Sequence, residues 1–332
     1  YASLGFIDWL PNENAYLIKS KDQILKVTVP NLDTTVFLAK KDFEIVGKNV
    51  LQSKNSDKAA PWVQTVYQNW EELIKSSTFW LSNDGSKILF ASEKNKIWRR
   101  SFSATYFYMN LKTKEIFPLS NDNSQIRNAK FSPDSKKIAY VRNDNNLYVY
   151  DLTKKRERQL TRDGSEVILN GHFGWVYEEE FGSFDGYRWS KDSEKIAFWR
   201  EDQSNVPTFL LFDELTLYPS VKKIRYPKAG EANPEMSIFV ANIKRGKPKK
   251  INVGDTDDVY LPWMEWFNSE SLVLMKMNRL QNNWTFLKIF PSGKKYSEGI
   301  SESDPNGWVQ LHRNYHFLKN GNLLWMSERD GW

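Results

Sequence analysis

The chain has 332 residues, 47 Lys and Arg against 41 Asp and Glu, and no cysteine. Its 40% hydrophobic and 27% charged residues exclude general disorder, and the missing cysteines exclude a disulfide scaffold, a thiolate metal site and a cysteine nucleophile in this stretch. The net charge of +6 is dispersed, so we attribute it to solubility and expect no nucleic-acid binding. No apolar stretch approaches the roughly 18 residues of a membrane span.

A repeated pattern runs through the whole chain. Each copy has an aromatic residue or Leu, then a polar turn, then an alternating apolar strand, and this pattern predicts a β-hairpin. The anchors of the six copies lie 72, 50, 58, 77 and 51 residues apart, at Trp9, Leu81, Phe131, Trp189, Trp266 and Phe317.

Further strands follow the hairpin within each copy. In the third copy Leu147 and Val149 lead through a polar turn to Arg158 to Leu160, which predicts four strands per repeat. A period of about 50 residues with four strands is typical of a β-propeller, whose blades bury aromatic faces between sheets. This fold explains the 14 Trp; the alternative is an irregular β-sandwich with accidental turns.

Two intervals between anchors are long enough to contain insertions. One insertion is expected between Val29 and Trp80, with a helix-prone patch at 70–75. The other is expected between Arg200 and Trp266.

Common catalytic signatures do not occur in the chain. It has no Gly-x-Ser-x-Gly, His-Glu-x-x-His, Gly-x-Gly-x-x-Gly or phosphate-loop motif. Of its three histidines, His312 and His316 have the spacing of helical metal ligands, but their surroundings predict a strand and turn. We therefore expect no metal site and no cofactor.

Three adjacent carboxylates, Glu178, Glu179 and Glu180, stand among aromatic residues in "GWVYEEEF" (174–181). One interpretation is a solvated acidic face. The other is a partly desolvated cluster that needs a cation, and a peptide ammonium, with a pKa of about 8, offers three donors that two carboxylates could share. Because neighbouring side chains on a helix point about 100° apart, two of them reach one ammonium only from a short, distorted turn.

At this point the residues resemble a known family. "GWVYEEEF", "YRWS", "AFWREDQSNVPTF" and "YPKAGEANP", with "MNRLQNN" and "SERDGW", look like the propeller of the dipeptidyl peptidase IV family, within the prolyl oligopeptidase class. The resemblance implies an all-β propeller over residues 1–332, with about six four-stranded blades of an eight-bladed ring and a short inserted helix or turn carrying the Glu cluster. Because the sixth blade is unfinished at Trp332, we expect a fragment or the ordered part of a longer protein, without the last blades and the α/β-hydrolase domain.

The resemblance also implies a substrate-binding site. Glu179 and Glu180 would hold the amino terminus of a peptide, and Glu178 would support them. In "KIWRRSFSATYFYM" the family's arginine for the carbonyl between the first two substrate residues falls at Arg99, with Arg100 beside it.

One further arginine departs from the family pattern. After "GWV" (307–309) the family can carry an aromatic residue and an arginine that line the substrate subsites. Arg313 corresponds to that arginine, whereas His312 is not the expected aromatic residue. The preferences of the extended subsites are therefore not carried over.

The mechanism implied by the resemblance is a molecular ruler. An extended peptide advances about 3.5 Å per residue, so an ammonium held about two residues from a nucleophile places the second peptide bond at the reaction centre. The expected function is a propeller that gates substrate access and binds the amino end in a serine exopeptidase that releases Xaa-Pro dipeptides. The Ser, Asp and His would lie in the hydrolase domain, so these 332 residues should bind or gate and not hydrolyse alone.

The resemblance extends to partners and location. It implies peptide substrates with a free amino terminus and Pro or Ala second, the protein's own hydrolase domain, and a homodimer to which the strands near Tyr226 to Pro234 contribute. The expected location is the periplasm, the cell surface or the medium. Two alternatives stay open: a prolyl tripeptidyl peptidase-type enzyme, and a non-catalytic protein-interaction propeller.

Overall fold

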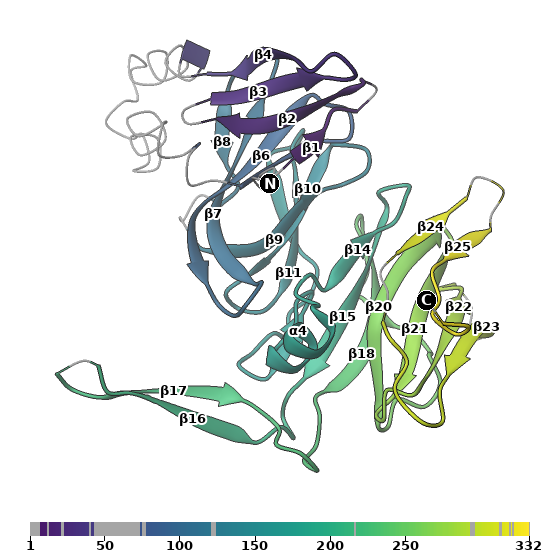
Figure 1. The fold of residues 1–332 in the computed structure, drawn as a ribbon. Helices are drawn as coiled ribbons and strands as arrows, with labels where there is room; N and C mark the ends of the chain where they lie inside the picture. Colours follow the sequence, from purple (N-terminus) through teal and green to yellow (C-terminus); the bar gives the residue numbers. More distant parts are fainter. Residues whose placement is uncertain are drawn as a thin grey trace. The chain divides into compact units, whose positions relative to one another are not determined.

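The computed structural model describes residues 7–11, 13–20, 23–39, 41–42, 74, 78–120, 124–215, 217–292, 296–311, 314–318, 320 and 322–331. These residues form antiparallel sheets, and among them α4 is the helix that is described over its full length (Figure 1). The chain makes two compact units: Tyr1–Ile97, Ser101–Asn143 and Tyr148–Arg158 in one, Trp98–Arg100, Asp144–Leu147 and Gln159–Trp332 in the other. No described helix has the length and apolar character to span a bilayer.

The amino-terminal half contains two sheets. The first has the order β1-β2-β3-β4, with strands Ile7–Trp9, Ala15–Ser20, Gln23–Thr28 and Asp33–Leu38. The second has the order β12-β11-β10-β9-β7-β6-β5, and β8 pairs with β7. Its strands are β5 Thr78–Leu81, β6 Lys87–Lys96, β7 Phe102–Asn110, β8 Ile116–Pro118, β9 Ile126–Phe131, β10 Lys137–Arg142, β11 Leu147–Asp151 and β12 Arg156–Gln159.

The described residues of the carboxy-terminal half form four sheets. In one, β13 (Ile168–Asn170), β15 (Lys195–Asp202), β18 (Glu235–Asn242) and β19 (Lys249–Lys250) pair in that order, and β14 (Tyr187–Trp189) also pairs with β15. The next has the order β20 (Val259–Asn268), β21 (Ser271–Asn278), β22 (Asn283–Ile289) and β23 (Tyr296–Ser303). The pairs β16 (Thr208–Asp213) with β17 (Ser220–Arg225), and β24 (Tyr315–Phe317) with β25 (Leu323–Trp325), form two-stranded sheets.

All six predicted hairpins are present. In each copy the anchor residue pairs with a residue of the following strand: Trp9 with Tyr16, Leu81 with Ile88, Phe131 with Ile138, Trp189 with Ile196, Trp266 with Leu272 and Phe317 with Leu323. The predicted β-propeller blades are therefore confirmed. Each sheet is open, and the single pair Ala104 and Ile126 joins the second and third repeats into one ladder.

Large aromatic side chains fill the spaces between sheets, as the Trp content indicates. Trp199, Trp266 and Trp284 are among the largest fully buried side chains. The Trp199 Nε1 donates to the Leu261 carbonyl at 2.8 Å, and the Trp266 Nε1 donates to the Arg188 carbonyl at 3.0 Å. These bonds cross from the β14–β15 sheet to the β20 sheet and satisfy two indole donors that would otherwise be buried without partners.

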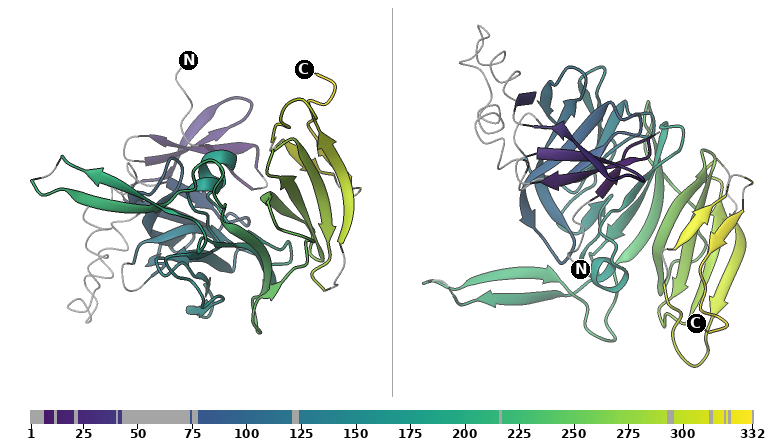
Figure 2. Two further views of the ribbon diagram at one scale, coloured as in Figure 1. Left: turned by 90° about the horizontal axis from the view of Figure 1, so that it is seen from below. Right: turned by 45° about the horizontal axis from the view of Figure 1, so that its top comes forward.

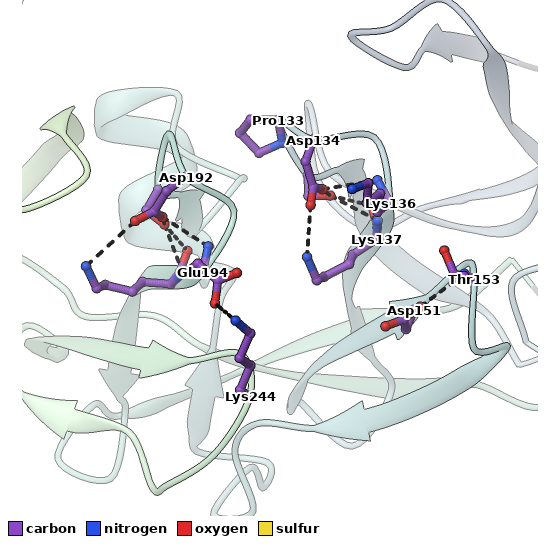
Figure 3. A network of polar contacts seen from close by, with 12 residues as sticks. Pro133, Asp134, Lys136, Lys137, Asp151, Thr153, Asp192, Glu194 and Lys244 are labelled. Carbon is purple, nitrogen blue, oxygen red and sulfur yellow. Dashed lines mark hydrogen bonds and ion pairs between the residues drawn. The ribbon is translucent and has the colours of Figure 1, made fainter.

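The same set of side-chain hydrogen bonds closes three of the described hairpin turns, and Figure 3 shows the aspartates of two of them, Asp134 and Asp192. In the third repeat the Ser132 hydroxyl donates to the Asp134 carboxylate at 2.5 Å and accepts the Lys137 backbone N–H at 3.0 Å. The equivalent triplets are Ser82, Asp84 and Lys87, and Ser190, Asp192 and Lys195. Because the serine binds both sides of the turn, it fixes the strand register beyond what the apolar pattern specifies.

The predicted insertion after Arg200 contains a hairpin arm formed by β16 and β17. Figures 1 and 2 show the arm extending away from the sheet that contains β15 and β18. Most of its side chains are exposed, including Leu210, Phe212 and Val221. The helix-prone patch predicted at 70–75 lies, except for Ile74, outside the described residues.

Candidate functional site

The three adjacent glutamates lie on α4, Trp175–Phe181, a helix of seven residues (Figure 1). Gly174 precedes it in an extended conformation, and Gly182 ends it with φ of 60°. That left-handed conformation suits glycine, and the Ser183 N–H bonds to the Tyr177 carbonyl at 3.0 Å, which closes the helix. The predicted short inserted helix or turn is confirmed.

Aromatic packing fixes the buried face of α4. Tyr177 is fully buried and stacks on Phe173, with ring centroids 5.3 Å apart. Its hydroxyl oxygen accepts the Leu261 backbone N–H at 3.0 Å. Burial raises the pKa of Tyr177 well above its ordinary value, so this hydroxyl stays neutral. The helix is therefore held at its middle by the β20 strand.

A buried carboxylate holds the amino end of α4. One oxygen of Glu201 accepts the Gly174 N–H at 2.9 Å, and the other accepts the Gln203 Nε2 at 2.7 Å. The Glu201 side chain is 0% exposed, and this burial raises its pKa to about 7, against the lowering effect of the two hydrogen bonds. Glu201 is therefore poised between its two protonation states near neutral pH.

Glu178 and Glu179 make different contacts with neighbouring arginines. Glu178 is 1% exposed, its Oε1 accepts the Arg100 backbone N–H at 2.5 Å, and its carbonyl accepts the Arg100 guanidinium at 3.1 Å. Glu179 is half-buried and takes the Arg99 guanidinium on both oxygens, at 3.2 Å from Nε and 2.7 Å from Nη2. Glu178 thus helps to hold α4 in place, whereas Glu179 contacts the exposed guanidinium of Arg99.

Glu180 is exposed at the end of α4, next to an aromatic surface. Tyr260 packs edge-on against Phe181 at 4.9 Å. Burial raises the pKa of Tyr260, and the Glu180 charge adds to that increase, which places this carboxylate within electrostatic range of the phenol. The Asn233 amide donates to the Tyr260 hydroxyl at 2.8 Å, so the "YPKAGEANP" segment borders the same surface.

The structure thus brings most of the predicted site residues together. Glu178, Glu179, Glu180 and Arg99 lie on or against α4, and Arg100 contacts Glu178. Arg313 and His312 lie outside the described residues, while His316 lies in β24. Within the described part of the chain, no group of three or more His, Cys, Asp or Glu side chains is placed to hold a metal ion.

Sequence reasoning missed the residues that support α4. In the sequence, Glu201 looks like an ordinary charged residue of a strand. It nevertheless shares a strand face with the buried Ala197 and Trp199. A carboxylate in the buried half of an alternating pattern is the signal that could have revealed it. Tyr260 carried no such signal, because it begins another buried strand more than 70 residues away from α4 along the chain.

The site contains more acidic than basic side chains. Three glutamates stand in sequence on α4, and two arginines contact them. Glu178 and Glu179 each have an arginine, and Glu180 is exposed. A helix edge with one exposed and one half-buried carboxylate offers acceptors for a cation with several N–H donors.

Comparisons with known proteins identify the family. Residues 82–332 match the dipeptidyl peptidase IV (DPP IV) N-terminal region. A probable dipeptidyl-aminopeptidase B of Talaromyces marneffei is 32% identical over 266 residues, which is 74% of this chain and 30% of that protein. The corresponding protein of Emericella nidulans is 33% identical over 270 residues, 74% of this chain and 29% of its own length.

Solved structures give the same result for the fold. The crystal structure of Porphyromonas gingivalis dipeptidyl peptidase 4 superposes with a TM-score of 0.83 at 26% identity, covering 98% of this chain and 44% of that one. A putative dipeptidyl aminopeptidase IV from Bacteroides ovatus has the same fold, with a TM-score of 0.69 at 22% identity over 98% of this chain and 41% of its own. The chain thus spans less than half the length of these proteins. It belongs to the dipeptidyl peptidase IV family, of which it carries the N-terminal propeller region.

Proposed function

We propose that this chain is the substrate-gating and amine-binding propeller of a dipeptidyl peptidase IV-like serine exopeptidase that releases Xaa-Pro dipeptides. The observation that carries the proposal is the two-pronged contact of Arg99 with Glu179, at 3.2 and 2.7 Å. It joins an arginine and an acidic helix that are 80 residues apart in the sequence. The two groups that a peptide amino end requires, an anion and a carbonyl donor, are therefore adjacent.

Each side chain has a distinct part in this proposal. Glu179 and Glu180 accept N–H bonds from the substrate ammonium, which selects a free amino terminus over an acylated one. Arg99 donates to the carbonyl between the first two substrate residues, for which its exposed guanidinium is suited. Glu178 supports the turn through its bonds to Arg100.

The support beneath the site favours binding with little reorganisation. Tyr177 and Glu201 hold the middle and the start of α4 through buried hydrogen bonds of 3.0 and 2.9 Å. Carboxylates held on such a rigid element lose little conformational entropy when a ligand arrives. The distance from this anchor to the nucleophile of the hydrolase domain then selects the peptide bond, because an extended chain advances about 3.5 Å per residue.

We also propose the partners and location that accompany this function. The arm β16–β17 presents Leu210, Phe212 and Val221 on one exposed face, and apolar faces of this kind serve as contacts between subunits. The arm and the adjoining segment 226–234 would contribute to a homodimer. The expected location is the periplasm, the cell surface or the medium, where peptides with Pro or Ala second are the substrates.

The test uses the complete natural protein that contains this chain, with a chromogenic Gly-Pro amide. We expect Glu179→Gln and Glu180→Gln each to lower kcat/KM by about 10- to 100-fold, since a charged hydrogen bond contributes about 1.5 to 3 kcal/mol. The matched control is Glu166→Gln, an exposed glutamate outside α4. Unchanged kcat/KM in both α4 variants would contradict the amine site.

A second readout separates the dipeptidyl enzyme from the tripeptidyl one. A peptide with Pro second and another with Pro third are digested, and the released fragments are identified by mass. Release of a dipeptide from the first peptide supports the proposal. Release of a tripeptide from the second, with the first intact, would contradict it.

A further inference from the structure

The carboxylate of Glu201 occupies an unusual place at the foot of the acidic helix. It shares a strand face with the buried Trp199, whereas most strand carboxylates point to water. Both of its oxygens are used, one by the Gly174 N–H at 2.9 Å and one by the Gln203 amide at 2.7 Å. Gly174 immediately precedes α4, so Glu201 touches the backbone from which the three glutamates project.

The space around Gly174 is too small for a side chain in the observed arrangement. A Cβ atom at this position would lie 1.9 Å from the Gln203 Nε2 and 2.6 Å from the Glu201 Oε1. Such distances mean that the pair presses directly against the glycine backbone. A change in how Glu201 and Gln203 bond to each other therefore acts directly on the backbone at the start of α4.

We propose that Glu201 is a positioning residue that sets the acidic helix from beneath, and that its protonation state is coupled to binding of the substrate ammonium. The inference rests on the proposed function, because it assumes that Glu179 and Glu180 bind the amine. It adds a pH-sensitive control of that site. Glu201 itself does not touch the substrate.

Gln203 can form a hydrogen bond with Glu201 in either protonation state of the Glu201 carboxyl group. When Glu201 is ionised, it accepts hydrogen bonds from both Gly174 and Gln203, as observed. When it is protonated, one oxygen becomes a donor and the Gln203 amide must turn to present its oxygen. Burial raises the pKa of Glu201 to about 7, so both states are populated near neutral pH.

The charged groups around Glu201 are few. From α4 the neighbouring titratable group is Tyr177, whose pKa is raised by burial, so it stays neutral. Leu169 on β13 and Met236 on β18 are the neutral residues paired with Glu201 across the ladders. On its own strand, Arg200 and Asp202 alternate to the opposite face, where they pair at 3.5 Å. The Arg200 guanidinium also bonds to Asp163, at 2.7 Å.

The coupling follows from charge and from linkage. A bound ammonium adds a positive charge to α4 and favours the ionised form of Glu201, which releases its proton to solvent. By reciprocity, ionising Glu201 strengthens binding of the ammonium. Affinity for the peptide should therefore rise as pH increases through neutrality, until the ammonium itself deprotonates near its pKa of about 8.

The experiment measures kcat and KM of the complete protein for a Gly-Pro amide from pH 5 to pH 8.5. In the wild type we expect KM to rise about fivefold on acidification from pH 8 to pH 6, because a roughly tenfold loss of ionised Glu201 is offset about twofold by protonation of the peptide amine. In Glu201→Gln, which carries no titrating proton, we expect less than a threefold change. The matched control is Glu302→Gln, a buried glutamate of β23 whose Oε1 accepts from Arg329 at 3.1 Å, and it should follow the wild type. An equally large rise in KM on acidification in Glu201→Gln would overturn the proposal.

A spectroscopic readout covers the case in which Glu201→Gln fails to fold. The infrared spectrum of the wild type at pH 6 should contain a protonated-carboxyl band that decreases when a peptide amide binds. Absence of any change in such a band on binding would overturn the coupling. The Glu179→Gln variant distinguishes the two proposals: unchanged KM there removes the amine site itself, whereas an unaltered pH profile in Glu201→Gln removes only the coupling.

Discussion

Arg99 and Glu179 meet through a two-pronged salt bridge, with Nε 3.2 Å from one carboxylate oxygen and Nη2 2.7 Å from the other. The arginine side chain is 67% exposed, so this pair adds little to the stability of the fold. Under the proposed function, a substrate ammonium would compete with Arg99 for the Glu179 oxygens. In that proposal the contact holds the two side chains next to each other before substrate arrives.

The first prediction concerns Arg99. Arg99→Lys should raise KM of the complete protein for a Gly-Pro amide by about 5- to 50-fold, because an ammonium cannot reproduce the planar fork of the guanidinium. The free energy of unfolding should change by less than about 0.5 kcal/mol, since the pair is exposed. Steady-state kinetics and urea titration measure the two quantities. Arg162→Lys, at another exposed arginine, is the control; a KM equal to that of the control would count against the role of Arg99.

The second prediction concerns the glycine before α4. Gly174→Ala should destabilise the chain by about 1 to 3 kcal/mol, because the added methyl group would meet Gln203 and Glu201 at 1.9 and 2.6 Å and force both side chains to shift. Gly299→Ala provides the comparison, since its Cβ would find ordinary contacts of 3.5 Å and longer. Thermal unfolding followed by circular dichroism measures both. Equal melting temperatures would show that the packing around Gly174 yields easily.

The third prediction concerns the pH dependence of stability. The pKa of Glu201 is raised from 4.5 to about 7 in the folded chain, so the folded state holds its proton more tightly than the unfolded state does. Its contribution to stability is therefore complete below about pH 4.5 and is lost as pH rises through 7, by up to about 3 kcal/mol. Glu201→Gln should remove this slope. Urea denaturation at several pH values between 4.5 and 8 measures it, and parallel stability curves for wild type and variant would refute the assignment.

The fourth prediction concerns the bond between α4 and β20. Tyr177→Phe deletes the hydroxyl that accepts the buried Leu261 N–H at 3.0 Å and leaves that donor without its partner. The expected loss is about 1 to 3 kcal/mol of unfolding free energy. Tyr16→Phe, at a partly exposed tyrosine of β2, should cost less than about 0.5 kcal/mol. A loss in Tyr177→Phe no larger than in this control would mean that water reaches Leu261.

The fold was predictable because its signals are local. Each hairpin, such as the one that pairs Phe131 with Ile138, combines a turn with an alternating strand within about ten residues. The acidic run Glu178 to Glu180 was visible for the same reason. The serine and aspartate of three of the turns also lie in the polar part of the repeat, although the sequence does not show their hydrogen bonds.

The contacts that support the site were not predictable, because they join distant segments. Glu201 is 27 residues from Gly174, and Leu261 is 84 residues from Tyr177. The alternation of β15 places Glu201 on the same face as Ala197 and Trp199, but it does not show which backbone group its carboxylate binds. The family resemblance located Arg99 but carried no information on Glu201, because that residue acts through packing geometry.

The hairpin arm interrupts the sequence without interrupting the sheet. β15 and β18 pair continuously from Lys195 opposite Asn242 to Asp202 opposite Glu235, on either side of the inserted β16–β17 pair. The pairing of β15 with β18 thus continues as if the insertion were absent. Lengthening the connection between these two strands costs little extra entropy. In evolutionary terms, the arm is a replaceable module: its sequence and length can change while the sheet that carries Glu201 keeps its strand pairing.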